Sequence, residues 1–492
     1  MAKKPPKVKA AGSALDMLVR QFSQPLACLR ELVQNAIDAG SNQVEVSLTH
    51  DSESGCLRLS VSDTGEGMTE HIVQTQLTRL FASSKEGDLT KVGKFGIGFV
   101  SVFALQPKAV VVDTGRQGES WRVLFKGDRS FELLRLPHGV EGTTVQLYLA
   151  REDHKIDELR QKVRETLMFW CRHCRVQIAV DGKPIGTDFD LLDPVQVTYE
   201  ETGTRLVLAV NSQAACFYGY YNQGLTLLEG NTSPVPHLSF KLDSRYLEHT
   251  LTRDNVIQNE DYAKGMALLD RVLKTLYPSV LYERLRAGTA SWELLVALQK
   301  LGVRSEEAPL YPDHQGQYYS LRQLRQSEVS YQAEEDELSR VAHDPAHHRL
   351  VLRLDEPALR WLRSQQVTVA PASDCWGFSE AAEGLEELLA LCGKFTSVRS
   401  LRAVRWRGKS PGDLLYPANR LGLIAWKEEA SKNPLLLLNV DHPDCLSLLQ
   451  LLQFSPLLAA QVLSQHLILR LPVGERPARA QALALAMLEE LA

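Results

Sequence analysis

The sequence predicts an α+β protein made of several compact units. A chain of 492 residues is too long for one hydrophobic core, so about three units are expected. Residues 30–40 carry apolar positions at helical spacing, whereas residues 56–62 and 144–149 alternate in the way strands do. Helix and strand patterns therefore occur within the same part of the chain.

The composition is that of an ordinary soluble protein. Hydrophobic residues make up 44% of the chain, charged residues make up 23%, and the formal net charge is −5. Such a charge gives no overall attraction to nucleic acid or to an anionic membrane. The lysine- and proline-rich residues 1–9 are not followed by an apolar stretch long enough for a signal peptide or a membrane span. We therefore expect a cytoplasmic protein with no membrane partner, and its eight scattered cysteines fit free thiols.

Three polar residues share one face of the helix predicted over residues 30–40. Glu31, Asn35 and Asp38 stand at positions i, i+4 and i+7, and Gly40 is a good helix stop. A carboxylate beside a carboxamide suits a site where the first group polarises a water molecule and the second offers an oxygen to Mg²⁺. By itself, an asparagine in an amphipathic helix is more often a solvated or capping residue.

Two glycine-containing motifs follow that helix. The strand over residues 56–62 leads into residues 63–68 (Asp-Thr-Gly-Glu-Gly-Met). Asp63 at the strand end can accept the amino hydrogen of a purine, and the glycines let the backbone approach the ring. Residues 93–99 (Gly-Lys-Phe-Gly-Ile-Gly-Phe) open an apolar run, and free amides at a helix start bind phosphate. Each motif alone is weak evidence, but the three in this order predict a nucleotide site.

With these motifs, the first hundred residues resemble the nucleotide-binding domain of the GHKL ATPases, a superfamily that includes gyrase, the ninety-kilodalton heat-shock chaperones, histidine kinases and MutL. The resemblance implies an α/β-sandwich (Bergerat-type) domain that binds ATP with Mg²⁺. It makes Glu31 the general base that aligns water, Asn35 the magnesium ligand and Asp63 the acceptor for the adenine amine. Histidine kinases generally lack this glutamate, so Glu31 indicates ATP hydrolysis.

The same resemblance assigns further residues to the nucleotide. Gly67 and Met68 would line the adenine pocket, and Thr143 matches a late Gly-Thr whose threonine helps to bind adenine. Lys85 falls in the segment that forms a lid in the family, where it would reach a phosphate or remain a solvated lysine. The other residues assigned to the nucleotide are Asp38, Gly93, Lys94, Phe95, Gly96, Gly98 and Phe99. Lys94 departs from the glutamine common in the chaperones.

Beyond the first domain, the order of patterns resembles that of the heat-shock chaperones. The expected units are an ATP-binding domain at 12–150, an α/β middle domain at 151–290, a small α/β middle subdomain at 291–375 and a helical C-terminal region at 376–492. Arg253 matches the middle-domain arginine that stabilises phosphate in the chaperones, a role suited to a permanent, planar charge. Alternatively, Arg253 is a helix-start residue paired with Asp254 or Glu260.

The resemblance implies an ATP-dependent chaperone that works in protein folding and the stress response. Its leucine-rich C-terminal helices would form a homodimer, although they could also pack within one subunit. The two subunits would act as a clamp on protein clients. The long client-binding insertions and the acidic tail motif of eukaryotic members are absent from the sequence.

The alternative function is a GHKL switch that acts on nucleic acid or in a defence system, as MutL does. It would need a basic groove or a nuclease centre. The one local basic cluster is Arg399, Arg402, Arg405, Arg407 and Lys409, and such a run is usually a solvated edge strand. Nucleic acid is therefore not an expected partner.

Two smaller clusters contain possible metal ligands. Cys171 and Cys174 form a single C-x-x-C without a second pair, and the histidines of residues 343–348 have no regular ligand spacing. We expect a structural role for the cysteines and a solvated loop for the histidines, instead of zinc or redox chemistry.

Overall fold

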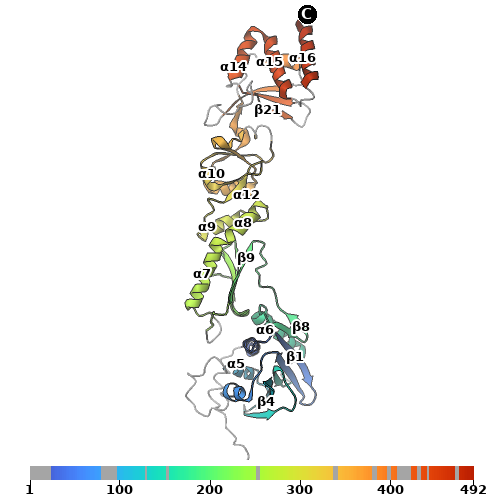
Figure 1. Ribbon diagram of the computed structural model, residues 1–492, viewed down its shortest axis with the longest axis vertical. Helices are drawn as coiled ribbons and strands as arrows, with labels where there is room; N and C mark the ends of the chain where they lie inside the picture. Colours follow the sequence, from blue (N-terminus) through green and yellow to red (C-terminus); the bar gives the residue numbers. More distant parts are fainter. Residues whose placement is uncertain are drawn as a thin grey trace, which may run out of the picture. The chain divides into compact units, whose positions relative to one another are not determined.

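The computed structural model describes most of the chain, which divides into two compact units, Met1–Val280 and Leu281–Ala492 (Figure 1). The described residues are 24–78, 97–127, 130–150, 155–250, 255–335, 339, 342–378, 385–395, 400–406, 423–428, 434–439, 443–470 and 476–491. Within these ranges, no helix combines the length and the apolar character that a membrane crossing requires. The fold is mixed α and β, as the sequence predicts.

An eight-stranded sheet forms the centre of the first unit, in the order β5-β4-β3-β6-β2-β1-β7-β8. Neighbouring strands are antiparallel except β1 and β7, which are parallel. The strands are β1 (Gln43–Asp51), β2 (Cys56–Asp63), β3 (Ala109–Arg116), β4 (Glu119–Lys126), β5 (Phe131–Arg135), β6 (Gly142–Leu149), β7 (Gln177–Val180) and β8 (Lys183–Ile185). The sheet thus continues past residue 150, where the sequence predicts the end of the first domain.

Helices α2 (Cys28–Asp38) and α6 (Ile156–Cys171) share one hydrophobic core with this sheet. In α2, Leu29, Leu32 and Val33 recur at the spacing of one helical face, and all three are buried. Burying each such side chain contributes roughly 1.5–3 kcal/mol. The shorter elements are η1 (Pro25–Ala27), α3 (Glu70–Ile72), the π-helical turn η2 (Val73–Leu77), α5 (Ile97–Val100) and η4 (Ser101–Leu105).

A five-stranded sheet follows in the first unit, in the order β12-β11-β13-β10-β9. Its strands are β9 (Gln196–Glu201), β10 (Thr204–Val210), β11 (Tyr218–Asn222), β12 (Leu225–Gly230) and β13 (Leu238–Ser244). Two helices come after this sheet, α7 (Glu260–Thr275) and α8 (Tyr277–Arg286), with Leu276 between them. The break falls two residues before Pro278, which lacks the N–H that a continuous helix requires.

The second unit begins with small helices and strands. A parallel three-stranded sheet has the order β17-β16-β18, beside the hairpin β14-β15. The elements are α9 (Glu293–Lys300), β14 (Pro309–Pro312), β15 (Tyr318–Ser320), α10 (Leu321–Arg325), β16 (Glu328–Tyr331), η6 (Pro345–His347), β17 (Arg349–Leu352), α12 (Glu356–Ser364), β18 (Val369–Pro371) and η7 (Ala372–Cys375). The sequence predicts that the histidines of residues 343–348 lie in a solvated loop. This is wrong for His343, whose ring is buried with Nε2 3.3 Å from Asp313 Oδ2.

Helices α14 (Pro443–Phe454), α15 (Pro456–Arg470) and α16 (Arg476–Leu491) end the second unit. A four-stranded sheet in the order β19-β20-β22-β21 precedes them, with α13 (Leu385–Phe395). Its strands are β19 (Trp376–Phe378), β20 (Ser400–Trp406), β21 (Leu423–Glu428) and β22 (Pro434–Asn439). Two residues of the basic cluster lie on β20, an inner strand of this sheet, where Arg402 pairs with Leu437 of β22 and Arg405 pairs with Gly377 of β19. Arg399, Arg407 and Lys409 lie outside the described residues.

Candidate nucleotide-binding site

Helix α2 carries Glu31 into a buried position, whereas Asn35 on the next turn is exposed. The Glu31 side chain lies directly against the glycine motif: a Cβ atom added to Gly98 would come within 2.6 Å of Glu31 Oε2. Any side chain at position 98 would therefore displace this carboxylate. The structure thus brings together the first and third sequence motifs at α2 and α5, with only 7% of Glu31 exposed.

Asp38 lies on the last turn of α2 and is bonded within its own helix. Its Oδ1 accepts a hydrogen bond from Gln34 Nε2 at 3.0 Å. Partial desolvation raises the pKa of the Asp38 carboxyl group, and the bond from Gln34 opposes that shift. The chain then turns back, because the N–H of Glu66 donates to the carbonyl of Ala39 at 3.0 Å. The end of α2 is therefore attached to the loop that contains the second motif.

Asp63 ends β2 and lies directly opposite Thr143 in β6. The N–H of Gly65 donates to Asp63 Oδ1 at 2.8 Å, and the N–H of Thr143 also bonds to this carboxylate. Burial raises the pKa of Asp63, although both N–H groups oppose the shift. The carboxylate is thus held in one orientation by backbone donors on either side.

Two glycines allow the loop after Asp63 to sit against the neighbouring strands. Gly67 has φ +66°, and a Cβ atom there would fall 2.1 Å from the carbonyl oxygen of Gly115. Gly142 has φ +70°, and its Cβ atom would fall 2.0 Å from the carbonyl oxygen of Asp63. Real Cβ atoms do not approach backbone this closely, and positive φ is costly for other residues. Only glycine fits at both positions.

Thr114 on β3 connects the predicted adenine residues, and sequence reasoning missed it. Its Oγ1 atom accepts the N–H of Met68 at 2.9 Å and lies 3.0 Å from the hydroxyl of Thr143. The same oxygen is 3.3 Å from the carbonyl of Gly142, and the residue is fully buried. In the sequence, Thr114 could have been noticed only as a lone hydroxyl residue near the end of the apolar strand that begins at Ala109.

The hairpin of β3 and β4 also holds the chain that follows Gly67. Arg116 forms an ion pair with Glu66. Glu119 Oε2 accepts the N–H of Glu70 at 3.0 Å and the indole N–H of Trp121 at 3.1 Å. These two bonds lower the pKa of the Glu119 carboxyl group. The start of α3 is thereby fixed to the sheet.

The remaining predicted residues divide into two groups. Phe99 is 5% exposed and packs on Phe125 with ring centroids 5.5 Å apart, so only its backbone is available to a ligand. Lys85, Gly93, Lys94, Phe95, Gly96 and Arg253 lie outside the described residues.

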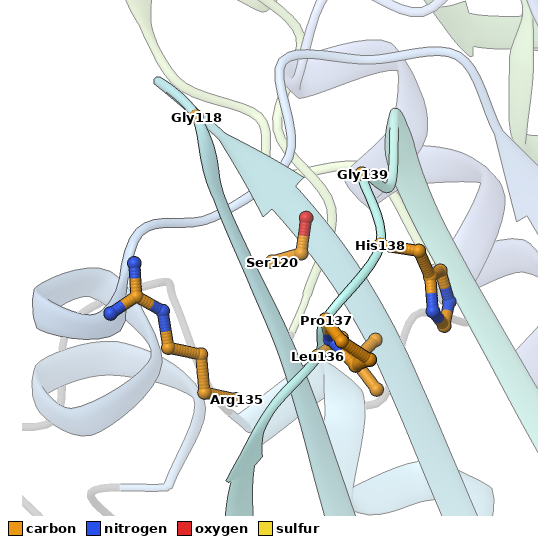
Figure 2. Close-up of a pocket in the computed structure, with 7 residues that line it drawn as sticks. All are labelled: Gly118, Ser120, Arg135, Leu136, Pro137, His138 and Gly139. Carbon is orange, nitrogen blue, oxygen red and sulfur yellow. The ribbon is translucent and has the colours of Figure 1, made fainter.

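A separate hollow of about 430 Å³ lies at the edge formed by β4 and β5. It is lined by Gly118, Ser120, Arg135, Leu136, Pro137, His138 and Gly139, none of which the sequence assigned to the nucleotide (Figure 2). Ser120 is its buried polar residue, and Ser120 Oγ already accepts the N–H of Val140 at 2.9 Å. Arg135 and His138 point away from one another (Figure 2). We assign no ligand to this hollow.

A family model matches the part of the chain that contains most of these residues. Residues 24–130 match the family described as histidine kinase-, DNA gyrase B-, and HSP90-like ATPase. Over these residues the chain is similar to GHKL-type ATPases. This match includes α2, the loop after Asp63 and Gly98, and excludes Thr143.

Curated relatives extend the likeness to the HtpG chaperones. "Chaperone protein HtpG" of Rhodospirillum rubrum is 30% identical over 204 residues, which cover 34% of this chain and 32% of the relative. The HtpG of Chlorobaculum tepidum is 26% identical over 311 residues, which cover 50% of this chain and 49% of the relative. The HtpG of Methylococcus capsulatus is 33% identical over 171 residues, which cover 28% of this chain and 26% of the relative. The matches thus span half of these relatives or less.

Proposed function

We propose that this chain hydrolyses ATP to ADP and phosphate, in a site formed by α2, β2, β6 and the start of α5. The observation that carries the proposal is the contact between the buried Glu31 carboxylate and Gly98. In a phosphate loop, backbone N–H groups bind the phosphates, so a carboxylate beside that loop is positioned to take a proton from an attacking water molecule.

Asp63 supplies the recognition of adenine in this proposal. A carboxylate is an acceptor only, so it pairs with the exocyclic amine of adenine and not with a carbonyl oxygen. Backbone donors from Gly65 and Thr143 keep Asp63 in place before the nucleotide arrives. Gly67, Met68 and the Thr143 hydroxyl complete the adenine pocket, and Thr114 positions them.

Asn35 is the proposed magnesium ligand. Its carboxamide is exposed one helical turn after Glu31, on the same face of α2. Mg²⁺ usually takes one or two oxygen ligands from the protein and completes its shell with water and substrate phosphates. A single carboxamide oxygen fits that pattern, and bound Mg²⁺ would neutralise phosphate charge. The same proposal includes in the nucleotide site the other residues that the resemblance assigns to it, Asp38, Lys85, residues 93–96 and Phe99. It also includes Arg253, which would stabilise phosphate.

The whole chain then acts as a cytoplasmic chaperone in which ATP drives a dimeric clamp on protein clients. The proposed units are 12–150, 151–290, 291–375 and 376–492, with α6, β7 and β8 of the 151–290 unit packed into the sheet and core of the 12–150 unit. Apolar side chains exposed on α14 and α16 support a homodimer, and the largest are Phe454 at 85% and Leu488 at 64% exposure. The chain resembles proteins named chaperones over at most half of its length.

Replacing Glu31 tests the proposed hydrolysis. Glu31→Ala should retain ATP binding, measured by calorimetry, and lose about 10²-fold or more of the phosphate release rate, because the general base is removed. Glu158→Ala, which removes an exposed helical glutamate, is the matched control and should behave as the wild type. A normal turnover rate in Glu31→Ala would remove Glu31 from this role.

Light scattering tests the proposed dimer. Phe454→Asp places a charge on the exposed face of α14 and should halve the mass measured for the wild-type full chain, because a buried unpaired charge opposes association. Leu192→Asp is the control, since Leu192 is equally exposed at 88% but lies in the first unit. A wild-type mass equal to that of one chain would contradict the dimer.

A further inference from the structure

The turn that follows α6 holds two thiols against one another. Cys171 is the last residue of α6, and the N–H of Cys174 donates to its carbonyl at 3.0 Å. The Cys171 thiol is close enough to Cys174 to raise the pKa of the Cys174 thiol. Cys171 is 2% exposed, whereas Cys174 is only partly buried. The proposed ATPase mechanism uses neither thiol.

The geometry of this turn suits a covalent link. A turn closed by a hydrogen bond over three residues keeps its first and last Cα atoms within about 7 Å. Disulfides require Cα atoms roughly 4.4–6.8 Å apart, so Cys171 and Cys174 can be joined with little movement of the backbone. Both thiols are free in this structure.

We propose that Cys171 and Cys174 form a redox site, which closes to a disulfide in the presence of an oxidised low-molecular-weight thiol and thereby slows ATP hydrolysis. The effect on hydrolysis rests on the function proposed above. The formation of the disulfide does not, because it depends only on the two thiols and the oxidant.

The exchange runs in two steps, with glutathione disulfide as the oxidant. The thiolate of Cys174, the more exposed residue, attacks one sulfur of glutathione disulfide and expels one glutathione thiolate. The sulfur of Cys171 then attacks Cys174 Sγ in the mixed disulfide and expels the second glutathione. Each cysteine loses one proton, and the two electrons pass to the glutathione, which leaves fully reduced.

The surroundings make this exchange slow at neutral pH. The contact with Cys171 and burial together hold the pKa of the Cys174 thiol well above its usual value, although the charge of Arg30 opposes that shift. The reactive form is the thiolate, so the rate should rise about tenfold per pH unit below this pKa. A slow pair of this kind responds to sustained oxidation of the thiol pool.

Metal binding is a poorer explanation of the same cysteines. His173 stands between them, but its Nε2 accepts from Lys241 Nζ at 3.1 Å, and its Nδ1 faces the carbonyl of Thr187 at 3.3 Å. Burial and the charge of Lys241 lower the pKa of His173 to about 3, so its ring is neutral. Across the described residues, no three His, Cys, Asp or Glu side chains are grouped to hold a metal ion.

The turn is well placed to affect the ATPase domain and the five-stranded sheet together. Arg172 Nη2 binds both carboxylate oxygens of Glu229 on β12, at 2.5 and 2.6 Å, and His173 binds Lys241 on β13. On the other side, the buried guanidinium of Arg30 lies 4.9 Å from the centroid of the Trp170 ring, and its charge acts on both thiols. Arg30 immediately precedes Glu31 in α2. A disulfide would therefore change a turn that contacts both parts.

Thiol counting on the full chain tests the disulfide directly. After incubation with glutathione disulfide at alkaline pH, the wild type should retain six of its eight thiols, with peptide mapping locating the new bond at Cys171 and Cys174. Cys174→Ser should form no such bond. Cys216→Ser, which removes a buried cysteine elsewhere, is the matched control and should still form it. A folded wild type that keeps all eight thiols would overturn the proposal.

Phosphate release by the same samples tests the coupling. The oxidised wild type should hydrolyse ATP several-fold more slowly, and dithiothreitol should restore the rate, while Cys174→Ser should be unaffected by the oxidant. A disulfide that leaves the rate unchanged would overturn the coupling. A protein that forms the disulfide but has no ATPase activity in either state would instead contradict the function proposed above.

Discussion

The two ends of the proposed nucleotide site are held in different ways. At the helix end, Glu31 is positioned by the packing of α2 and by its contact with Gly98. At the strand end, Asp63 is held by two backbone N–H groups and lies among glycines that approach neighbouring strands closely. The helix end thus depends on one carboxylate for its chemistry, whereas the strand end depends on a network. Substitutions at the helix end should therefore impair catalysis, whereas substitutions at the strand end should impair nucleotide binding and stability.

The largest effect on binding is expected for Asp63→Asn. The new amide group offers a donor where the adenine amine requires an acceptor, so ATP affinity should fall about 100-fold, corresponding to roughly 3 kcal/mol for a hydrogen bond to a charged group. Calorimetry measures this change. Asp51→Asn is the control, because Asp51 ends the neighbouring strand β1 and accepts the N–H of Ser54 in its own turn. Undiminished affinity in Asp63→Asn would show that Asp63 does not bind the adenine amine.

Gly67→Ala should have the largest effect on folding at the strand end. Gly55 has the same φ, +66°, but no atom lies within 4 Å of its would-be Cβ, whereas Gly67 would meet Gly115. The two variants are compared by their free energies of unfolding in denaturant. The difference between them measures the cost of placing a Cβ atom at position 67 against Gly115. We expect about 1 kcal/mol of destabilisation at Gly55 and roughly 3 kcal/mol or more at Gly67. Equal effects would show that the loop can move away from β3.

Thr114→Val should have an intermediate effect on both stability and binding. It leaves the N–H of Met68 without its acceptor, which costs about 1–3 kcal/mol in a buried position. ATP affinity should fall as well, because Met68 and Thr143 lose a shared contact. Thr226→Val is the control: Thr226 is also buried, but it bonds to Phe169, so only stability should fall. If both variants bind ATP normally, Thr114 has no part in the site.

The smallest effect concerns pH. The pKa of Asp63 is raised by burial, so the stability that protonated Asp63 contributes is present below the ordinary pKa of aspartate and is lost as the pH rises through the raised value. ATP affinity should change in the opposite direction and weaken on acidification, because the protonated carboxyl is a poorer acceptor. Isothermal titration at several pH values measures this, and Asp63→Asn should remove the dependence.

Much of the site could be predicted because its signals are local. The helical face of Glu31, Asn35 and Asp38 follows from residue spacing, and Asp63 follows from a strand that runs into glycines. The roles of these residues, including that of Thr143 in binding adenine, came from the family resemblance. The structure confirms the mixed fold and sets Thr143 opposite Asp63, whereas the roles stay predictions.

Other features depend on residues far apart in the chain. Thr114 meets Met68 and Thr143 only after three strands have paired, so no local pattern identified it. The central place of β20 and the burial of His343 against Asp313 were missed for the same reason.

The sequence by itself determined the mixed architecture and the polar residues of the nucleotide motifs, since helix and strand periods and glycine positions are written in neighbouring residues. Only the tertiary structure decided which glycines have no room for a side chain, which hydroxyl holds the loop and which two thiols touch. Those features depend on distances across strands and between helices, and such distances are set by packing rather than by residue order.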